Sequence, residues 1–238
     1  MKAYLKRSQA LRGLKKDLTF LRHAVFSGQR RRFRQYLQHA LVPALHIGVY
    51  RSLLPGWLNT DINPVDKEVV YMDATAPFPA PSASFKYVFA EHVIEHVGFA
   101  DGLAMIRECR RVLVPGGVLR ISTPDLAFLL KLHIDRGKDS IAYLDFIRHS
   151  GSLSSGPLQE EALPALVINN AFRAWGHQFL YDEPTLIGSL LQAGFLDVRR
   201  GQYGVSSHET LNGIERHGET IRNEEIARME SMIIEAVA

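Results

Sequence analysis

The segment between Tyr87 and Asp125 constrains the fold more than any other part of the chain. It reads as an apolar strand, a polar turn, a helical pattern, a Pro-Gly-Gly turn at Pro115–Gly117 and a second apolar strand. Two apolar strands with a helix-length connection between them are typical of parallel pairing, because parallel strands need a crossover of a dozen or more residues. The segment therefore predicts a strand–helix–strand unit within an α/β domain.

The rest of the chain continues this alternation. Strands are expected near residues 44–48, 57–61, 68–72, 86–90, 118–122, 197–203 and 232–236. The pattern predicts helices over residues 101–113, with Asp101 as a candidate N-cap, and over 184–192, with Gly194 ending the helix. We expect a mostly parallel sheet with helices on both faces.

Charge divides the chain into two parts. Residues 1–40 hold 11 of the 28 Lys and Arg but only one acid, Asp17, so the remainder is net acidic. Apolar residues from Tyr4 to Val25 recur at helical spacing, and a second short helix is expected from Arg30. We interpret residues 1–43 as a basic helical arm that docks on its own domain. Contact of residues 1–40 with a membrane surface or a partner helix is the alternative.

Composition excludes several classes of protein. Cys109 is the only cysteine, so an internal disulfide is excluded and a reducing compartment fits. No run approaches the ~18 apolar residues of a membrane span. The basic start lacks an apolar stretch typical of secretion signals. The expected location is cytoplasmic, with membrane association through the arm as a variant.

Small or polar residues follow each of the first four expected strands. Ligands of open parallel sheets bind outside the carboxyl ends of the strands. A glycine lets a ligand approach the backbone, and a carboxylate there can accept hydrogen bonds from ribose hydroxyls or an adenine amino group. The residues are Gly48, Asp61, Asp73 with Ala74, and Glu91 with His92.

Five stretches resemble one family. LHIGVYRSLLPGWLNTDINP, YMDATAPFPAPSASFKYVFAEHVIEHV, RVLVPGGVLRISTPD, LQAGF and SMIIEAVA are similar to the methyltransferase type 11 group of class I S-adenosylmethionine-dependent methyltransferases. The resemblance covers residues 44–238. It implies a Rossmann-like sheet of seven strands, the last one antiparallel, and S-adenosylmethionine as methyl donor. By position, it assigns Gly48 to the methionine end of the donor, Asp61 to its ribose, Asp73 with Ala74 to its adenine, and Glu91 with His92 to its flank.

The first loop departs from the family pattern. Gly48-Val49-Tyr50 lacks a second glycine, and only eight residues (Val49–Gly56) separate the first two strands, too few for a normal helical crossover. A non-catalytic binding or scaffold protein with a degenerate donor loop is therefore the alternative. A nicotinamide dehydrogenase fits poorly because no G-x-G-x-x-G motif follows the first strand. Nucleic acid is an unlikely partner because the arm has few aromatic residues.

His92, Glu95 and His96 form an H-x-x-E-H sequence, which also occurs in zinc proteases. Two histidines at this spacing share a face if they lie on a helix. Because the flanking strands complete a methyltransferase core, we expect no metal. The motif either braces the start of the helix or orients donor or acceptor.

Two long connections, residues 126–183 and 204–230, are expected to form lid insertions at the carboxyl edge. We place the acceptor among His177, His208, Arg216 and His217, with His92 or His177 as the general base if the acceptor is a hydroxyl. By analogy with the group, the expected acceptor is a small molecule or a saccharide-type compound.

Overall fold

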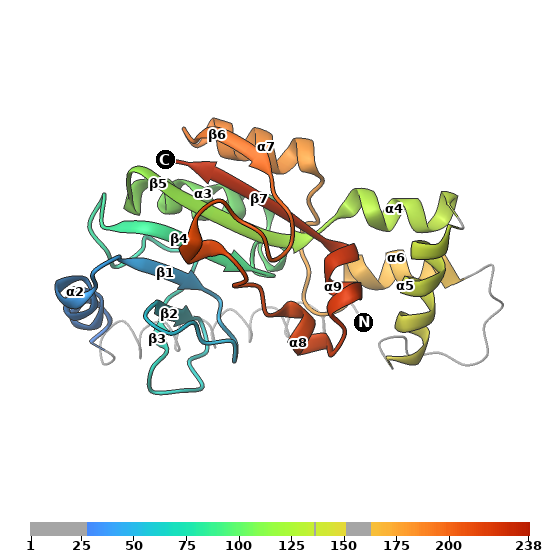
Figure 1. Ribbon diagram of the computed structural model, residues 1–238, viewed down its shortest axis with the longest axis horizontal. Coiled ribbons are helices and arrows are strands. Elements are labelled where there is room, and N and C mark those ends of the chain that lie inside the picture. Colours follow the sequence, from blue (N-terminus) through green and yellow to red (C-terminus); the bar gives the residue numbers. More distant parts are fainter. Residues whose placement is uncertain (1–27, 136, 151–162) are drawn as a thin grey trace, which may run out of the picture.

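The computed structural model describes residues 28–135, 137–150 and 163–238. Seven strands form one sheet in the order β3-β2-β1-β4-β5-β7-β6 (Figure 1). Their bounds are β1 (Ala44–Ile47), β2 (Leu58–Asp61), β3 (Val70–Tyr71), β4 (Phe85–Glu91), β5 (Leu113–Pro124), β6 (Leu196–Arg200) and β7 (Ser231–Val237). All seven expected strands are present; β3 is shorter than expected, and β6 ends at Arg200 instead of residue 203.

Strand direction agrees with the expected fold class. β1 to β5 pair in parallel, and β7 pairs antiparallel with both β5 and β6. Ile47 is in register with Thr60 of β2 and Ala90 of β4. The carboxyl ends of β1, β2 and β4 therefore lie at one edge of the sheet, where ligands of such sheets bind.

Helices surround the sheet. They are α2 (Gln29–His39), α3 (Phe99–Val112), α4 (Leu126–Ile134), α5 (Lys138–His149), α6 (Leu163–Arg173), α7 (Glu183–Gln192), α8 (His217–Ile221) and α9 (Glu224–Glu230), with short 3₁₀ turns η1 (Ile94–His96) and η3 (Glu209–Leu211). The prediction that Asp101 caps α3 is wrong: the N-cap is Gly98, and Asp101 lies in the first turn, where its charge still favours the positive end of the helix. Gly194 follows α7 with φ +91°, as predicted.

The two faces of the sheet are covered differently. One face packs against α2, α3 and α7 around Leu45, Val88, Ile106 and Leu190. Within the described residues, the other face is covered by the β1–β2 connection and by the segment that follows β6, which bring Leu54, Leu211 and Ile214 onto Phe89. Residues 48–57 contain no helix, so the short first crossover expected from the sequence is present.

A buried ion-pair cluster fastens the segment after β6 to the sheet. Arg120 of β5 is fully buried, with Glu215 at 2.5 Å and Glu235 of β7 at 2.7 Å. Its guanidinium also donates to the carbonyls of Gln202 (2.9 Å) and Val205 (3.1 Å). One side chain thus joins β5, β7 and residues 202–215.

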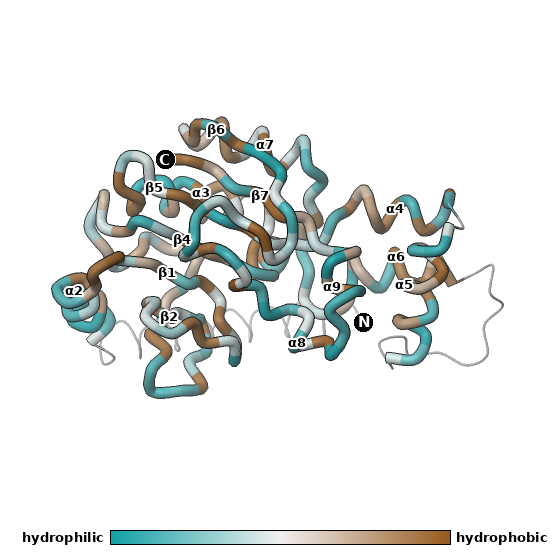
Figure 2. Tube along the Cα trace, in the orientation of Figure 1, coloured by the Kyte–Doolittle hydropathy of each residue, from teal (hydrophilic) through white to brown (hydrophobic). Residues whose placement is uncertain are grey.

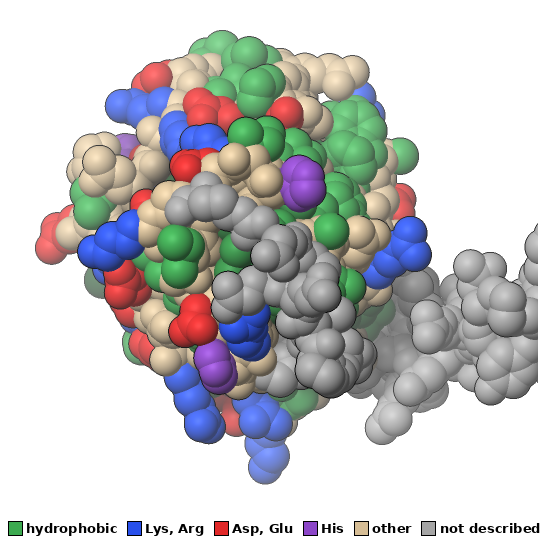
Figure 3. Space-filling view, turned by 90° about the vertical axis from the view of Figure 1, so that its right-hand side faces the viewer, with side chains coloured by type: hydrophobic (Ala, Val, Ile, Leu, Met, Phe, Trp, Pro, Cys, Tyr) green, Lys and Arg blue, Asp and Glu red, His purple; other side chains and the backbone are tan. Residues whose placement is uncertain are grey.

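The two expected insertions pack against each other beside the sheet (Figure 1). Leu132 of α4, Leu144 of α5, Val167 of α6 and Ile226 of α9 belong to a second buried cluster. On the end of the molecule formed by α4, α5 and α6, charged side chains of both signs alternate with hydrophobic ones (Figure 3). Whether this helical region opens and closes over the sheet stays a prediction.

Only the end of the basic arm is described. α2 is largely hydrophilic (Figure 2), yet it docks through buried Phe33, which packs edge-on against Phe85 at 6.4 Å. Arg32 donates to the carbonyls of Lys67 and Val69, and Tyr36 donates to that of Ala44. Residues 28–40 thus dock on the domain. The stripe from Tyr4 to Val25 lies outside the described residues.

Across the described ranges, no helix has both the length and the apolar character that a bilayer span requires.

Candidate active site

The carboxyl edge of β1 and β2 places Asp61 beside the turn after β1. Asp61 Oδ2 accepts from the backbone N–H of Tyr50 at 2.9 Å, and Oδ1 accepts from that of Asn63 at 2.7 Å. Each carboxylate oxygen has a second lone pair. The Asp61 side chain is half-buried, so these lone pairs remain available for a pair of ligand hydroxyls.

Gly48 is the point of closest approach at the end of β1. Its φ is +71°, and a Cβ at this position would lie 2.3 Å from Cγ2 of Val93. Only glycine fits, for reasons of both backbone conformation and space. Tyr50, where the family pattern has its second glycine, also has positive φ (+46°) and is largely exposed.

Asp73 and Ala74 follow β3, as predicted. Asp73 is 8% exposed, and its Oδ1 accepts from the backbone N–H and the hydroxyl of Thr75, at 2.9 and 2.6 Å. Ala74 packs against the main core. The two residues continue the edge formed by Gly48 and Asp61.

Glu91 binds the second insertion. Its carboxylate accepts from the backbone N–H groups of Arg216 (2.8 Å) and His217 (3.1 Å). Burial raises the pKa of Glu91, although these N–H groups and the nearby His92 oppose the rise. Glu91, which is predicted to lie beside the donor, therefore also holds residues 216–217 in position.

His92 lies directly after β4 with φ +50°. Its Nδ1 is 3.1 Å from Glu95 Oε1, and its Nε2 is 3.3 Å from the hydroxyl of Ser231. Burial by itself lowers the pKa of His92, but the surrounding carboxylates, above all Glu95, outweigh burial and hold the pKa above its ordinary value.

His217 stacks on His92, with ring centroids 3.6 Å apart. Its Nε2 lies 2.8 Å from Glu230 Oε1, and Glu230 Oε2 accepts from the hydroxyl of Tyr143 at 2.7 Å. Burial lowers the pKa of His217, whereas the carboxylates around His92 raise that of His92, so the two stacked rings differ in proton affinity. This arrangement links both insertions to the end of β4.

His177 reaches the same region from the connection between α6 and α7. Its Nδ1 is 2.7 Å from the carbonyl of Ala171, and its ring meets that of His96 edge-on at 5.0 Å. A carbonyl only accepts, so Nδ1 carries the proton and the neutral ring keeps its lone pair on Nε2. Burial lowers the pKa of His177, which favours that neutral form.

The other two predicted acceptor residues lie elsewhere. His208 packs beside Tyr87, with ring centroids 5.8 Å apart, near the start of β4 and away from its carboxyl end. The guanidinium of Arg216 donates to the carbonyls of Gly213 and Glu215 in its own loop. Two of the four predicted acceptor residues, His177 and His217, have their side chains at the carboxyl edge. Arg216 reaches this edge only with its backbone N–H.

Several residues of the site were not predicted from the sequence. Glu230, Tyr143 and Ser231 come from distant parts of the chain, and no local pattern marks them. Glu95 and His96 were marked by the H-x-x-E-H sequence, but η1 is a three-residue 3₁₀ turn that excludes His92, so the helical face expected for two histidines is absent.

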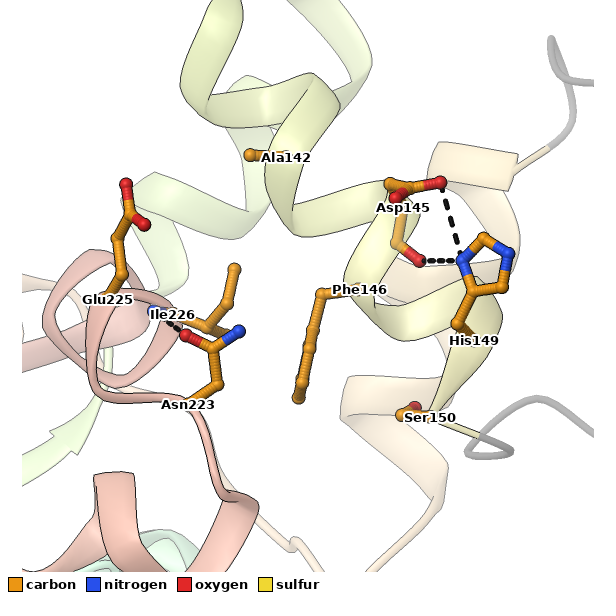
Figure 4. A pocket seen from close by; sticks show the side chains of 8 residues that line it. All are labelled: Ala142, Asp145, Phe146, His149, Ser150, Asn223, Glu225 and Ile226. Carbon is orange, nitrogen blue, oxygen red and sulfur yellow. Dashed lines mark hydrogen bonds and ion pairs between the residues drawn. The ribbon is translucent and has the colours of Figure 1, made fainter.

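A cavity of about 520 Å³ lies elsewhere, between α5 and α9 (Figure 4). Asp145 pairs with His149 there at 3.4 Å, and Asn223 caps α9. These polar groups already have partners within the protein, and the lining residues belong to α5, α9 and the positions beside them, whereas the predicted site residues follow β1 to β4. The carboxyl edge of the sheet is therefore the candidate active site.

Comparison with known proteins identifies the class of domain. Residues 57–121, from the start of β2 into β5, match the family model of the type 11 methyltransferase domain. Together with the strand order and the antiparallel β7, the match identifies a class I S-adenosylmethionine-dependent methyltransferase domain. The methyl donor of this domain is S-adenosylmethionine.

Among solved structures, the chain is similar to an S-adenosylmethionine-dependent methyltransferase from Archaeoglobus fulgidus (17% identity, 88% of this chain and 92% of that one, TM-score 0.47). It is also similar to one from Mesorhizobium loti (13%, 86% and 96%, TM-score 0.46). A third is Haemonchus contortus phosphoethanolamine N-methyltransferase 2 in complex with S-adenosylmethionine (15%, 88% and 52%, TM-score 0.43). No curated protein matches the sequence.

Proposed function

We propose that the chain transfers a methyl group from S-adenosylmethionine to an oxygen of a small-molecule or saccharide-type acceptor. The observation that carries the proposal is the half-buried Asp61 carboxylate at the end of β2, beside the glycine turn of β1 and in line with Asp73. In this assignment Asp61 accepts from the donor's ribose, Asp73 with Ala74 faces its adenine, and Gly48 faces its methionine end.

The acceptor side is formed by the histidines after β4. Transfer breaks the bond from the donor sulfur to the methyl carbon and forms a bond from that carbon to the acceptor oxygen. The methyl sulfonium is already activated, so the protein contributes mainly alignment and removal of the hydroxyl proton. His177, with its lowered pKa and its lone pair on Nε2, suits the acceptor side better than His92, whose pKa is raised and whose two ring nitrogens face Glu95 and Ser231.

Calorimetric titration with S-adenosylmethionine and S-adenosylhomocysteine tests the donor site. Asp61→Ala should weaken donor binding by about 10- to 100-fold, because hydrogen bonds to a charged group contribute roughly 1.5–3 kcal/mol. Asp145→Ala is the matched control: it removes a carboxylate from the α5–α9 cavity and should leave the affinity unchanged. Equal affinities of wild type and Asp61→Ala would refute the assignment.

A non-catalytic binding protein is the second candidate function. The crowding of Gly48 by Val93 favours it, because the methionine end of the donor is assigned to the same place. The same titration separates the two: a folded wild-type protein that binds neither the donor nor its product supports the binding-protein alternative. Micromolar binding of both supports the enzyme.

A further inference from the structure

Glu95, His96 and His177 form a cluster of which the proposed function uses only His177. One ligand atom from each lies within 4.8 Å of the other two. Glu95 and His96 come from η1, and His177 comes from the connection between α6 and α7, 81 positions farther along the chain. Two imidazoles and one carboxylate make up the three-ligand set of open zinc sites.

The carboxylate of this cluster, that of Glu95, is buried. The Glu95 side chain is fully buried, and its Oε2 accepts from the hydroxyl of Thr123 at 3.0 Å. Its Oε1 receives no well-formed hydrogen bond from any described residue and has ion-pair contacts with His92 at 3.1 Å and His96 at 4.0 Å. A buried carboxylate is costly unless it is paired, and a metal cation beside Oε1 would add to the pairing with His92.

One nitrogen of each imidazole lies within 4.8 Å of a carboxylate oxygen of Glu95. His96 Nε2 lies 4.0 Å from Glu95 Oε1. His177 is fixed as the tautomer with a free Nε2 by the bond from its Nδ1–H to the carbonyl of Ala171, the kind of outer partner that orients metal-bound histidines. Ligand atoms around tetrahedral zinc lie about 3.3 Å apart, so the cluster must contract by roughly 1 Å.

The chain holds His177 in place independently of its ring. The backbone N–H groups of Gln178 and Phe179 donate to the carbonyl of Glu95 at 2.7 and 3.2 Å, and Gln178 Nε2 donates to the carbonyl of His96 at 2.6 Å. Three hydrogen bonds therefore pin the segment that carries His177 onto the turn that carries the other two ligands.

We propose that Glu95, His96 and His177 bind one divalent transition metal of the zinc type, with an open position for an oxygen ligand. The His96 side chain is 39% exposed and His177 is half-buried, so the open position faces solvent. The binding of the metal is independent of the proposed methyl transfer. The role of the open position, which is to hold and activate the acceptor oxygen in place of the base role given to His177 Nε2, depends on the proposed function.

The experiment is a titration of the metal-stripped full chain with Co²⁺, followed by its visible absorption and repeated in competition with Zn²⁺. One equivalent should bind, Zn²⁺ should displace Co²⁺, and Mg²⁺ should not, because nitrogen ligands favour the transition metals. His96→Ala and His177→Ala should each weaken binding by at least about tenfold, since loss even of an outer partner costs 10- to 100-fold.

His149→Ala is the control, because His149 is an exposed histidine paired with Asp145 on α5. It should bind Co²⁺ like the wild type. Circular dichroism checks the fold of each variant, and both replaced side chains are partly exposed. Absence of saturable binding, or equal binding in the His96→Ala, His177→Ala double variant, would overturn the proposal. Donor titration of the same samples is a separate readout: loss of donor binding with intact Co²⁺ binding counts against the proposed function only.

Discussion

Replacement of Arg120 by methionine should be among the most destabilising single changes in the described part of the chain. Arg120 is completely buried and pairs with Glu215 and Glu235. The Glu215 side chain is also fully buried, and that of Glu235 is 10% exposed. Methionine has a similar length but no charge and no donors, so both carboxylates and the carbonyls of Gln202 and Val205 lose the hydrogen bonds that Arg120 donates to them.

The expected magnitude follows from the number of groups left behind. Removing one member of a buried ion pair costs about 3–5 kcal/mol, because the remaining charge is buried and unpaired. For a chain of 150–250 residues each kcal/mol lowers the melting temperature by roughly 2–4 °C, so a fall of about 6–20 °C is expected. Arg120→Lys keeps the charge but not the planar set of five donors, so it should fall between wild type and Arg120→Met.

Guanidinium unfolding followed by circular dichroism measures the loss, and hydrogen exchange locates it. Amides of residues 202–216 should exchange faster in Arg120→Met than those of β1 and β4, because Arg120 is the link between that segment and β5. A free energy of unfolding within about 1 kcal/mol of wild type would show that the buried ion pairs do not hold this segment.

Three further predictions concern the core. Burial lowers the pKa of His46 to about 4, although the hydrogen bond with Asn59 opposes the shift. The stability that this group contributes should therefore be complete above pH 6.5 and fall by up to about 3 kcal/mol as the pH drops toward 4. Unfolding curves of wild type and His46→Gln at pH 7 and 4.5 should reveal this difference, and parallel curves would disprove it. The hydroxyl of Tyr181 is buried without a hydrogen-bond partner among the described residues, and a Cβ on Gly102 would lie 2.5 Å from that hydroxyl. Gly102→Ala should therefore cost about 1–3 kcal/mol of stability, and adding Tyr181→Phe should restore most of the loss. An equal loss in the double variant would rule out this contact as the cause. Burial raises the pKa of the Cys109 thiol and shields it, so a thiol reagent should label it only as fast as the core opens; rapid labelling of native protein would contradict this.

The fold was largely predictable because its signals are local. The apolar strands on either side of α3 and the Pro115–Gly117 turn define the strand–helix–strand unit, and Gly194 marks the end of α7. The prediction of Asp101 as the N-cap was wrong because an acid is tolerated at several positions near a helix start. The N-cap residue of α3 is set by the point at which the chain leaves η1.

The position of Asp61 and Asp73 at the carboxyl edge of the sheet was predictable for a similar reason. Asp61 and Asp73 follow the β2 and β3 strands at their carboxyl ends, and parallel pairing brings such ends together without further information. Their place follows from strand order alone.

The grouping of histidines beyond the end of β4 was decided by tertiary packing. Glu95 and His96 meet His177 only because Gln178 and Phe179 bond to the carbonyl of Glu95, and no pattern in the sequence records that contact. Likewise His217 stacks on His92 because the segment after β6 is fastened to the sheet by buried charges. The sequence by itself determined the strands and the place of Asp61 and Asp73 at strand ends, since periodicity and turn chemistry act over short distances. Only the folded chain decided which distant side chains share the site, since long-range contacts depend on the packing of whole elements.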